Sequence, residues 1–165
     1  MECRTVRIGD IVRLEDSKRQ PLSSRDREDR KGDYPYYGAQ GVVDYLDDYT
    51  YDGDYLLVAE DGENLRSRKQ PIANAARGRF RVNNHAHVVA ATERCNLIYL
   101  RYLLNSMDIA AYVTGSTQPK LSQTSLLNMN IELPEIEEQN TVAAYLDCFD
   151  TKIATNTKLN GYLAV

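Results

Sequence analysis

The two histidines of the chain, His85 and His87, stand two positions apart in the segment NNHAHVV. On a strand, residues with this spacing face the same side of a sheet. With a third ligand such as Glu60 or Asp61, the pair could hold a metal ion. More often such a pair forms a polar patch that can donate hydrogen bonds to a phosphate or a base. We favour the patch and expect no metal site.

Paired carboxylates, at Asp47–Asp48 and Glu60–Asp61, are the other residues that could support chemistry. Adjacent residues on a strand point to opposite faces, so these pairs are poorly placed for hydrolysis. The sequence has no G-x-x-x-x-G-K-[ST] or G-x-G-x-x-G phosphate loop, no G-x-S-x-G elbow and no Asn-Pro-Pro-Tyr-type tetrapeptide of amino-methylating enzymes. We therefore expect a recognition protein rather than an enzyme, with a small hydrolase or nuclease as a less favoured alternative.

Basic residues gather in one segment of a chain whose net charge is −4. The segment from Glu63 to Arg81, called the basic stripe below, has six basic residues and one acidic residue. DNA binding needs a basic face rather than a basic average, so the basic stripe is a candidate phosphate contact. A solvated loop is the alternative.

The composition is that of an ordinary globular protein. The 165 residues suit one domain, with 42% hydrophobic and 27% charged residues. Three scattered cysteines without C-x-x-C spacing indicate neither a disulfide framework nor a zinc site, so we expect a reducing, cytoplasmic location. No run approaches 18 apolar residues, so we expect no membrane association.

Short strands dominate the first part of the expected fold. Glycines punctuate runs rich in Val, Leu and Tyr between Asp33 and Gly62, a strand–turn–strand pattern. Residues 15–33 are highly charged, which predicts an exposed loop. The expected strands are 42–46, 55–60, 71–75, 79–82, 85–90 and 129–133.

An amphipathic helix is predicted at 97–113, because apolar residues recur there every three or four positions. Asn96 can cap its start and Gly115 suits its end. The segment GSTQPKL, residues 115–121, then offers polar side chains at Ser116, Gln118 and Lys120. We expect a placed loop that contacts a ligand or braces the domain. A short helix at 122–127 follows.

A long helix is predicted from Pro134, which suits a helix's first turn. Residues then recur at steps of four and three, the heptad seam of a coiled coil with Asn at two inner positions. The seam consists of Val142, Leu146, Phe149, Ile153, Asn156, Asn160 and Leu163. Pairing with another chain is favoured, and an ordinary core helix is the alternative. The expected fold is α+β: a mixed, β-rich domain at 1–133 with packed helices, followed by a coiled-coil-type helix at 134–165.

Several segments resemble the specificity (S) subunit of type I restriction-modification systems. They are VRIGDIV, YPYYGAQGVVDY, LLVAEDG, NHAHVV, YLRYLL and the stretch from GSTQPKL to LPEIEEQ. G-S-x-Q-P-K-L, followed at an interval by L-P-x-x-E-E-Q at the start of a long helix, is the most specific part. The chain looks like one target recognition domain, 1–133, and one helical spacer, 134–165, where the family usually has two of each. It is similar to a natural half-subunit, a truncated product or a shortened form, and these alternatives stay open.

The resemblance implies a non-catalytic subunit that reads one half of a bipartite target in double-stranded DNA. It implies modification subunits that bind S-adenosylmethionine and a restriction subunit that uses ATP with Mg²⁺, while this chain holds no cofactor. It also implies a homodimer, or a pair with a second half-subunit, through the terminal helix. The alternative function is a protein-interaction adaptor that binds modification subunits without reading DNA.

Candidate DNA contacts follow from the basic stripe, the polar loop and the resemblance. Phosphate contacts are expected from Arg66, Arg68, Lys69, Arg77 and Lys120. Base contacts are expected from Tyr36, Tyr37, Gln40, Asn84, His85, His87, Ser116 and Gln118. Alternatively, Tyr36 and Tyr37 pack beneath the sheet and Asn84 only satisfies a turn.

Overall fold

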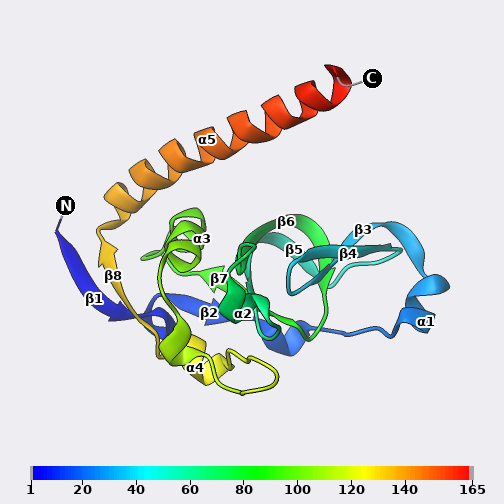
Figure 1. Ribbon diagram of the computed structural model, residues 1–165, viewed down its shortest axis with the longest axis horizontal. Coiled ribbons are helices and arrows are strands. Elements are labelled where there is room, and N and C mark those ends of the chain that lie inside the picture. The colour runs from blue at the N-terminus through cyan, green and yellow to red at the C-terminus, as the bar shows by residue number, and fades with distance from the viewer. Residues whose placement is uncertain (1, 164–165) are drawn as a thin grey trace.

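The computed structural model describes residues 2–163, which form an α+β domain and a long projecting helix (Figure 1). The strands are β1 (Cys3–Arg7), β2 (Val12–Leu14), β3 (Lys31–Gly38), β4 (Gly41–Leu46), β5 (Tyr51–Ala59), β6 (Ala73–Val82), β7 (Ala86–Ala91) and β8 (Asn130–Pro134). The α-helices are α1 (Ser24–Glu28), α2 (Asn64–Ser67), α3 (Leu97–Ser106), α4 (Gln123–Leu127) and α5 (Ile136–Leu163). Short 3-10 turns lie at Ile8–Asp10, Asp16–Lys18 and Ala110–Tyr112. The predicted fold class is confirmed.

Within the described residues, six strands form one sheet in the order β2-β7-β5-β6-β3-β4, antiparallel except for the parallel pair β3–β6. Side chains alternate across β5. Leu56 and Val58 enter the core to which α3 contributes, whereas Leu57 enters a second core around Phe80. Because both of its faces are covered, the end of β5 is a continuous apolar run.

Strand β6 replaces the two short strands expected at 71–75 and 79–82. It is continuous because Gly78, at φ +73°, lies opposite Gly53, at φ +138°, and both tolerate a backbone that strains other residues. The strands expected at 42–46, 55–60, 85–90 and 129–133 correspond to β4, β5, β7 and β8.

Helix α3 starts as predicted and ends early. The side chain of Asn96 accepts hydrogen bonds from Ile98 N and Tyr99 N. At the other end the guanidinium of Arg68 donates to the carbonyls of Leu104 and Asn105, both at 2.9 Å. These bonds satisfy carbonyls that a longer helix would use internally. The predicted extension to 113 is therefore wrong, and Gly115 does not end this helix.

The segment 15–33, expected to be a plain loop, contains a 3-10 turn, α1 and the first residues of β3. Ser23 caps α1 by accepting a hydrogen bond from Asp26 N at 3.2 Å. Pro134 also differs from expectation. It ends β8 opposite Cys3 in the two-stranded sheet β1–β8, and α5 begins only at Ile136.

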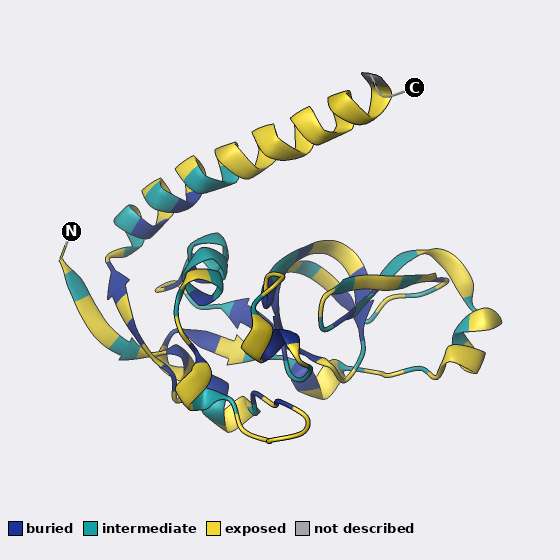
Figure 2. Cartoon of the chain, viewed as in Figure 1, coloured by how far each residue is buried: buried dark blue, intermediate teal, exposed yellow. Residues whose placement is uncertain are grey.

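The first turns of helix α5 contain buried and half-buried residues, whereas its later turns project from the domain and are exposed (Figure 2). Its first half packs against α3, with Val142 and Leu146 half-buried. Phe149 and Ile153 are 63% and 62% exposed, and from Thr151 to Tyr162 every residue is exposed. Asn156 and Asn160 lie in this exposed half, while the side chain of Leu163 lies outside the described residues. The core-helix alternative thus fits only the first half.

Figure 1 also shows that the loop before α4 lies on the far side of the domain from α5. None of the helices within residues 2–163 is both long and apolar enough to cross a membrane.

Candidate nucleic-acid interface

Four connections come together on the domain: the β3–β4 turn, the β5–α2 connection, the β6–β7 turn and the loop 115–121. Backbone hydrogen bonds join them, from Asn83 N to Tyr37 O at 2.9 Å and from Glu60 N to His85 O at 2.9 Å. A third runs from Gly62 N to Pro119 O at 3.0 Å. We call six of their exposed residues the loop surface: Gln40, Asn84, His85, Ser116, Gln118 and Lys120.

The loop 115–121 is closed and braced. Thr114 and Lys120 exchange two backbone hydrogen bonds of 2.8 Å across its base. The guanidinium of Arg66 donates to the carbonyls of Gly115 and Ser116. Gly115 has φ +83°, and a Cβ there would lie 2.2 Å from the carbonyl oxygen of Gln118, so only glycine fits. The loop is therefore an ordered platform that presents an exposed tip.

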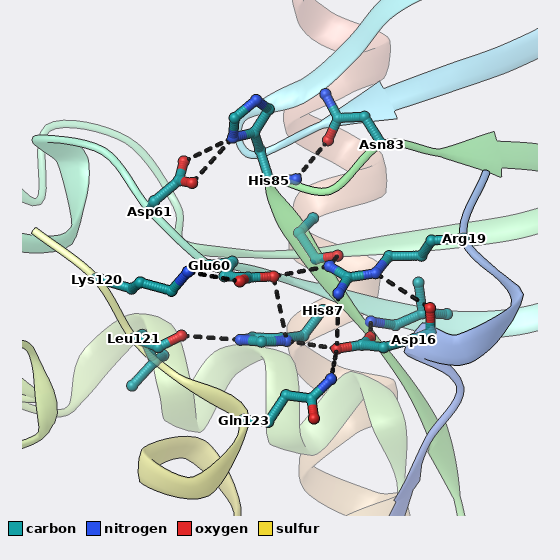
Figure 3. A network of polar contacts seen from close by, with 12 residues as sticks. Asp16, Arg19, Glu60, Asp61, Asn83, His85, His87, Lys120, Leu121 and Gln123 are labelled. Atoms are coloured by element: carbon teal, nitrogen blue, oxygen red, sulfur yellow. Dashed lines mark hydrogen bonds and ion pairs between the residues drawn. The ribbon is translucent and has the colours of Figure 1, made fainter. Parts of the chain in front are cut away.

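A buried hydrogen-bond network holds this loop from beneath (Figure 3). The ring of His87 is fully buried, with Nδ1 2.7 Å from Asp16 Oδ2 and Nε2 2.8 Å from the Leu121 carbonyl oxygen. A ring that carries a proton on each nitrogen satisfies both oxygen atoms. Asp16 also accepts from Val88 N at 2.7 Å and from the Gln123 amide at 2.8 Å. One buried pair thus connects the turn after β2, strand β7, the loop and α4.

Glu60 extends the network toward the surface. Its carboxylate is 2.7 Å from the guanidinium of Arg19 and 3.1 Å from the ammonium of Lys120. Its backbone carbonyl accepts from Leu121 N at 2.8 Å. Both the side chain and the backbone at Glu60 therefore fix the end of the loop.

Three possible metal ligands do come together, but they include only one of the two histidines considered in the sequence. Ligand atoms of Asp16, Glu60 and His87 lie within 4.8 Å of one another. Arg19 already pairs with both carboxylates, at 3.4 Å and 2.7 Å, so a cation would have to displace a guanidinium. His85 points elsewhere, with Nδ1 2.9 Å from Asp61 Oδ2. The arrangement suits a hydrogen-bonded brace better than a metal centre.

The electrostatics of the brace depend on Asp16. Burial alone would raise the pKa of its carboxyl group, but hydrogen bonds from His87, Val88 N and Gln123 outweigh that effect and lower the pKa below 3.8. The pKa of Glu60 is likewise lowered, because bonds from Arg19 and Lys120 outweigh its burial. Both carboxylates are therefore ionised near neutral pH.

Six predicted contact residues are brought together on the loop surface, and others are not. Tyr36 is buried with its hydroxyl accepting from Leu22 N at 3.0 Å, so the base contact predicted for it is wrong. Tyr37 is half-buried with its ring against Phe80, as in the packing alternative. His87 is wrong as a base contact, because the brace uses both of its ring nitrogens.

The basic stripe does not form one face. Arg68 donates hydrogen bonds to carbonyls at the end of α3, and Arg81 is buried against Asp48. Arg77 points toward α5, with its Nη2 4.0 Å from Asp147 Oδ2. Lys69 is exposed beyond α2, and Arg66 is exposed while it holds the loop carbonyls. The stripe is therefore dispersed, because alternate strand residues and the α2 turn direct these cations to different partners.

Asp16 and Arg19 belong to the network beneath the loop, and the sequence did not reveal them. Both stand in the segment expected to be a solvated loop, and nothing in their local pattern distinguishes them from its other charges. Their role depends on partners far along the chain, Glu60 immediately after β5 and Val88 on β7.

We predict that Asp16→Asn lowers the free energy of unfolding at pH 7 by about 1.5–3 kcal/mol, because hydrogen bonds to a charged group are lost. The folded-state pKa of Asp16 is depressed, so its contribution is present above about pH 4 and is lost as the pH falls through the folded pKa. The difference in the free energy of unfolding between wild type and variant, measured by urea titration, should therefore become smaller below about pH 4.

Asp33→Asn, at an exposed position, is the matched control and should follow the wild type. A variant as stable as wild type at pH 7, or a difference that stays constant down to pH 3, would contradict this role of Asp16.

The chain matches the family "Type I restriction modification DNA specificity domain" over residues 2–163. It is 31% identical over 140 residues to a type I restriction enzyme specificity subunit of Haemophilus influenzae, covering 85% of this chain and 35% of that protein. It is 28% identical over 159 residues to the EcoprrI specificity subunit of Escherichia coli, covering 93% of this chain and 37% of that protein. The chain thus spans little more than a third of each relative.

A solved structure agrees at the level of the fold. The S subunit of a type I restriction-modification system from M. genitalium superposes with a TM-score of 0.75 at 16% identity, covering 94% of this chain and 41% of that one. The family match extends over the domain and α5 together, and the resemblance found in the sequence is confirmed. The chain belongs to the type I restriction modification DNA specificity domain family.

Proposed function

We propose that the chain reads one half of a bipartite target in double-stranded DNA, as the specificity subunit of a type I restriction-modification complex. The family match over residues 2–163 carries this proposal. Specificity subunits are non-catalytic, so the chain is not an enzyme. The loop surface supplies the reading chemistry, and α5 supplies the attachment to other chains.

Two kinds of side chain on the loop surface suit DNA. The amides of Gln40, Asn84 and Gln118 each have a donor and an acceptor, the pair that recognises adenine in the major groove. Lys120 is exposed, and its ammonium, 3.1 Å from the Glu60 carboxylate, can also contact a phosphate. His85 and Ser116 add a ring nitrogen and a hydroxyl. Uncharged readers on an ordered loop lose little conformational entropy on binding.

The exposed half of α5 is proposed to pair with the same helix of a second copy or of another half-subunit. In an antiparallel pair with two-fold symmetry, identical patches meet. The helix spans 28 residues, about 42 Å at ~1.5 Å per residue. That length exceeds one turn of B-DNA, about 34–36 Å, so two domains could face successive grooves.

Partner subunits complete the proposal. Modification subunits would bring S-adenosylmethionine, and a restriction subunit would bring ATP and Mg²⁺, in a cytoplasmic complex. This chain would hold no cofactor of its own and would dock these subunits.

Selection from random double-stranded DNA, with modification subunits present, tests the proposal directly. We expect enrichment of split sequences whose two halves are related by two-fold symmetry. Modification subunits alone are the control and should enrich no such site. An adaptor that does not read DNA predicts no enrichment with the chain added, and metal-dependent turnover by the isolated chain would instead indicate a nuclease.

Substitutions on the loop surface should separate phosphate contacts from base contacts. Lys120→Ala should weaken binding to all sequences alike and reduce the slope of log K against log salt by about 0.9. Gln118→Ala should cost about 1–3 kcal/mol at one base position. Arg25→Ala, an exposed change on α1, is the control. If the double variant of Gln118 and Lys120 folds and binds as wild type does, the loop is only a brace.

Ile153→Asp should convert a dimer into a monomer in sedimentation at micromolar concentration, because it places a charge in an apolar seam without disturbing the domain. Thr155→Asp adds the same charge on another face of α5 and should leave the dimer intact. A wild type that stays monomeric at high concentration would refute the pairing.

A further inference from the structure

The junction between α5 and the domain has to be stiff for a split site to have one defined gap. The helix is about 42 Å long at ~1.5 Å per residue. A tilt of about 5° at its base would move its far end by about 3.7 Å, which equals roughly one base-pair step of ~3.4 Å. A loosely attached helix would thus accept gaps that differ by one or more base pairs.

Gln139 holds the base of the helix. Its side chain is buried, and its amide oxygen accepts a hydrogen bond from Asn96 N at 2.9 Å. Its amide nitrogen donates to the carbonyls of Pro134 at 2.9 Å and Arg94 at 3.1 Å. One side chain therefore connects the end of β8, the turn before α3 and the first turns of α5. The neighbouring Asn140 accepts from the Asn96 amide at 2.7 Å, which adds a direct link to the cap of α3.

A second attachment lies eleven residues further along the helix, about 16 Å away at ~1.5 Å per residue. Asp150 accepts from the Arg101 guanidinium and from the Tyr102 hydroxyl of α3, both at 2.8 Å. The Arg101 guanidinium stacks 4.4 Å from the centre of the Tyr102 ring. Burial and the bond to Asp150 raise the pKa of Tyr102 to about 12, so its hydroxyl stays a donor. Two attachments at different points along α5 fix its angle to the domain, whereas a single attachment would let the helix pivot.

We propose that Gln139 and the Arg101–Tyr102–Asp150 contact act as positioning residues that fix the angle of α5 and thereby determine which gap between DNA half-sites the paired protein accepts. The inference rests on the proposed function. It adds that gap selectivity resides in the junction of each chain as well as in the pairing of the helices. Substitutions in the junction should therefore alter gap selectivity without any change at the loop surface.

The same selection from random DNA tests this inference with Gln139→Ala and Asp150→Asn. Both variants should enrich the wild-type half-site sequences with gaps spread over one or more additional base pairs. Asp150→Glu keeps a carboxylate and should stay close to the wild-type gap. Glu137→Gln removes an exposed charge from the same helix and is the matched control.

A distance measurement in the full chain gives a second readout without DNA. Spin labels would be attached to cysteines introduced at two exposed positions, by Ser17→Cys and Lys158→Cys. The native Cys3 and Cys148 would be replaced by Ser, and the labelled protein would be diluted with unlabelled protein. We expect one narrow distance distribution for the wild type and a broader one for Asp150→Asn, whose exposed position spares the core.

The outcomes separate the two hypotheses. If the wild type enriches one gap and both variants enrich that same gap, the positioning role is refuted and the proposed function stands. If the wild type enriches no divided site, the proposed function fails and this inference fails with it. An unchanged distance distribution in Asp150→Asn would also refute the positioning role.

Discussion

The constraint on which the structure depends is that a charge removed from water needs partners, and the pair Asp16–His87 meets it most completely. His87 is fully buried, and each of its polar atoms has an oxygen partner. Asp16 has three partners from two segments, His87 and Val88 on β7 and Gln123 on α4. Breaking such a pair leaves an uncompensated charge, which costs far more than an exposed contact contributes. This pair helps to order the loop 115–121, because the carbonyl oxygen of Leu121 at the end of the loop contacts His87 Nε2.

The same constraint separates residues that can meet a ligand from residues that cannot. Composition and spacing place cations in the basic stripe but do not say which of them will satisfy a helix end or a buried carboxylate. Arg68 and Arg81 do so in the structure, and they are therefore unavailable to a phosphate. The exposure of polar residues at turns was easier to predict, because Gln118 precedes Pro119 and Asn84 follows Asn83, and Pro and Asn are typical turn residues.

Periodicity predicted much of the fold for physical reasons. Strands β4 and β5 and the start of α3 follow from alternation, helical spacing and the Asn96 cap, which are local properties. The end of α3 does not, since it depends on Arg68 from a turn more than thirty residues earlier. The start of α5 was misplaced for a similar reason: Pro134 pairs with Cys3 at the opposite end of the chain. Gln139 carried no local signal either, because its three partners lie in the turn before α3 and at the end of β8.

In the proposed function, the loop surface reads DNA and α5 joins two chains, two tasks that one surface would perform badly. Lys120 and His85 already have acidic neighbours, so the amides at the tip are left as the more specific contacts. In the proposed function, a surface of this kind would discriminate between bases but would attract DNA weakly, because the chain as a whole is acidic. Affinity would then have to come from linking two weak readers, since a rigid linkage raises the effective concentration of the second site. That gain holds only when the linker geometry matches the target, which makes the junction at Gln139 and Asp150 as important to recognition as the loop itself.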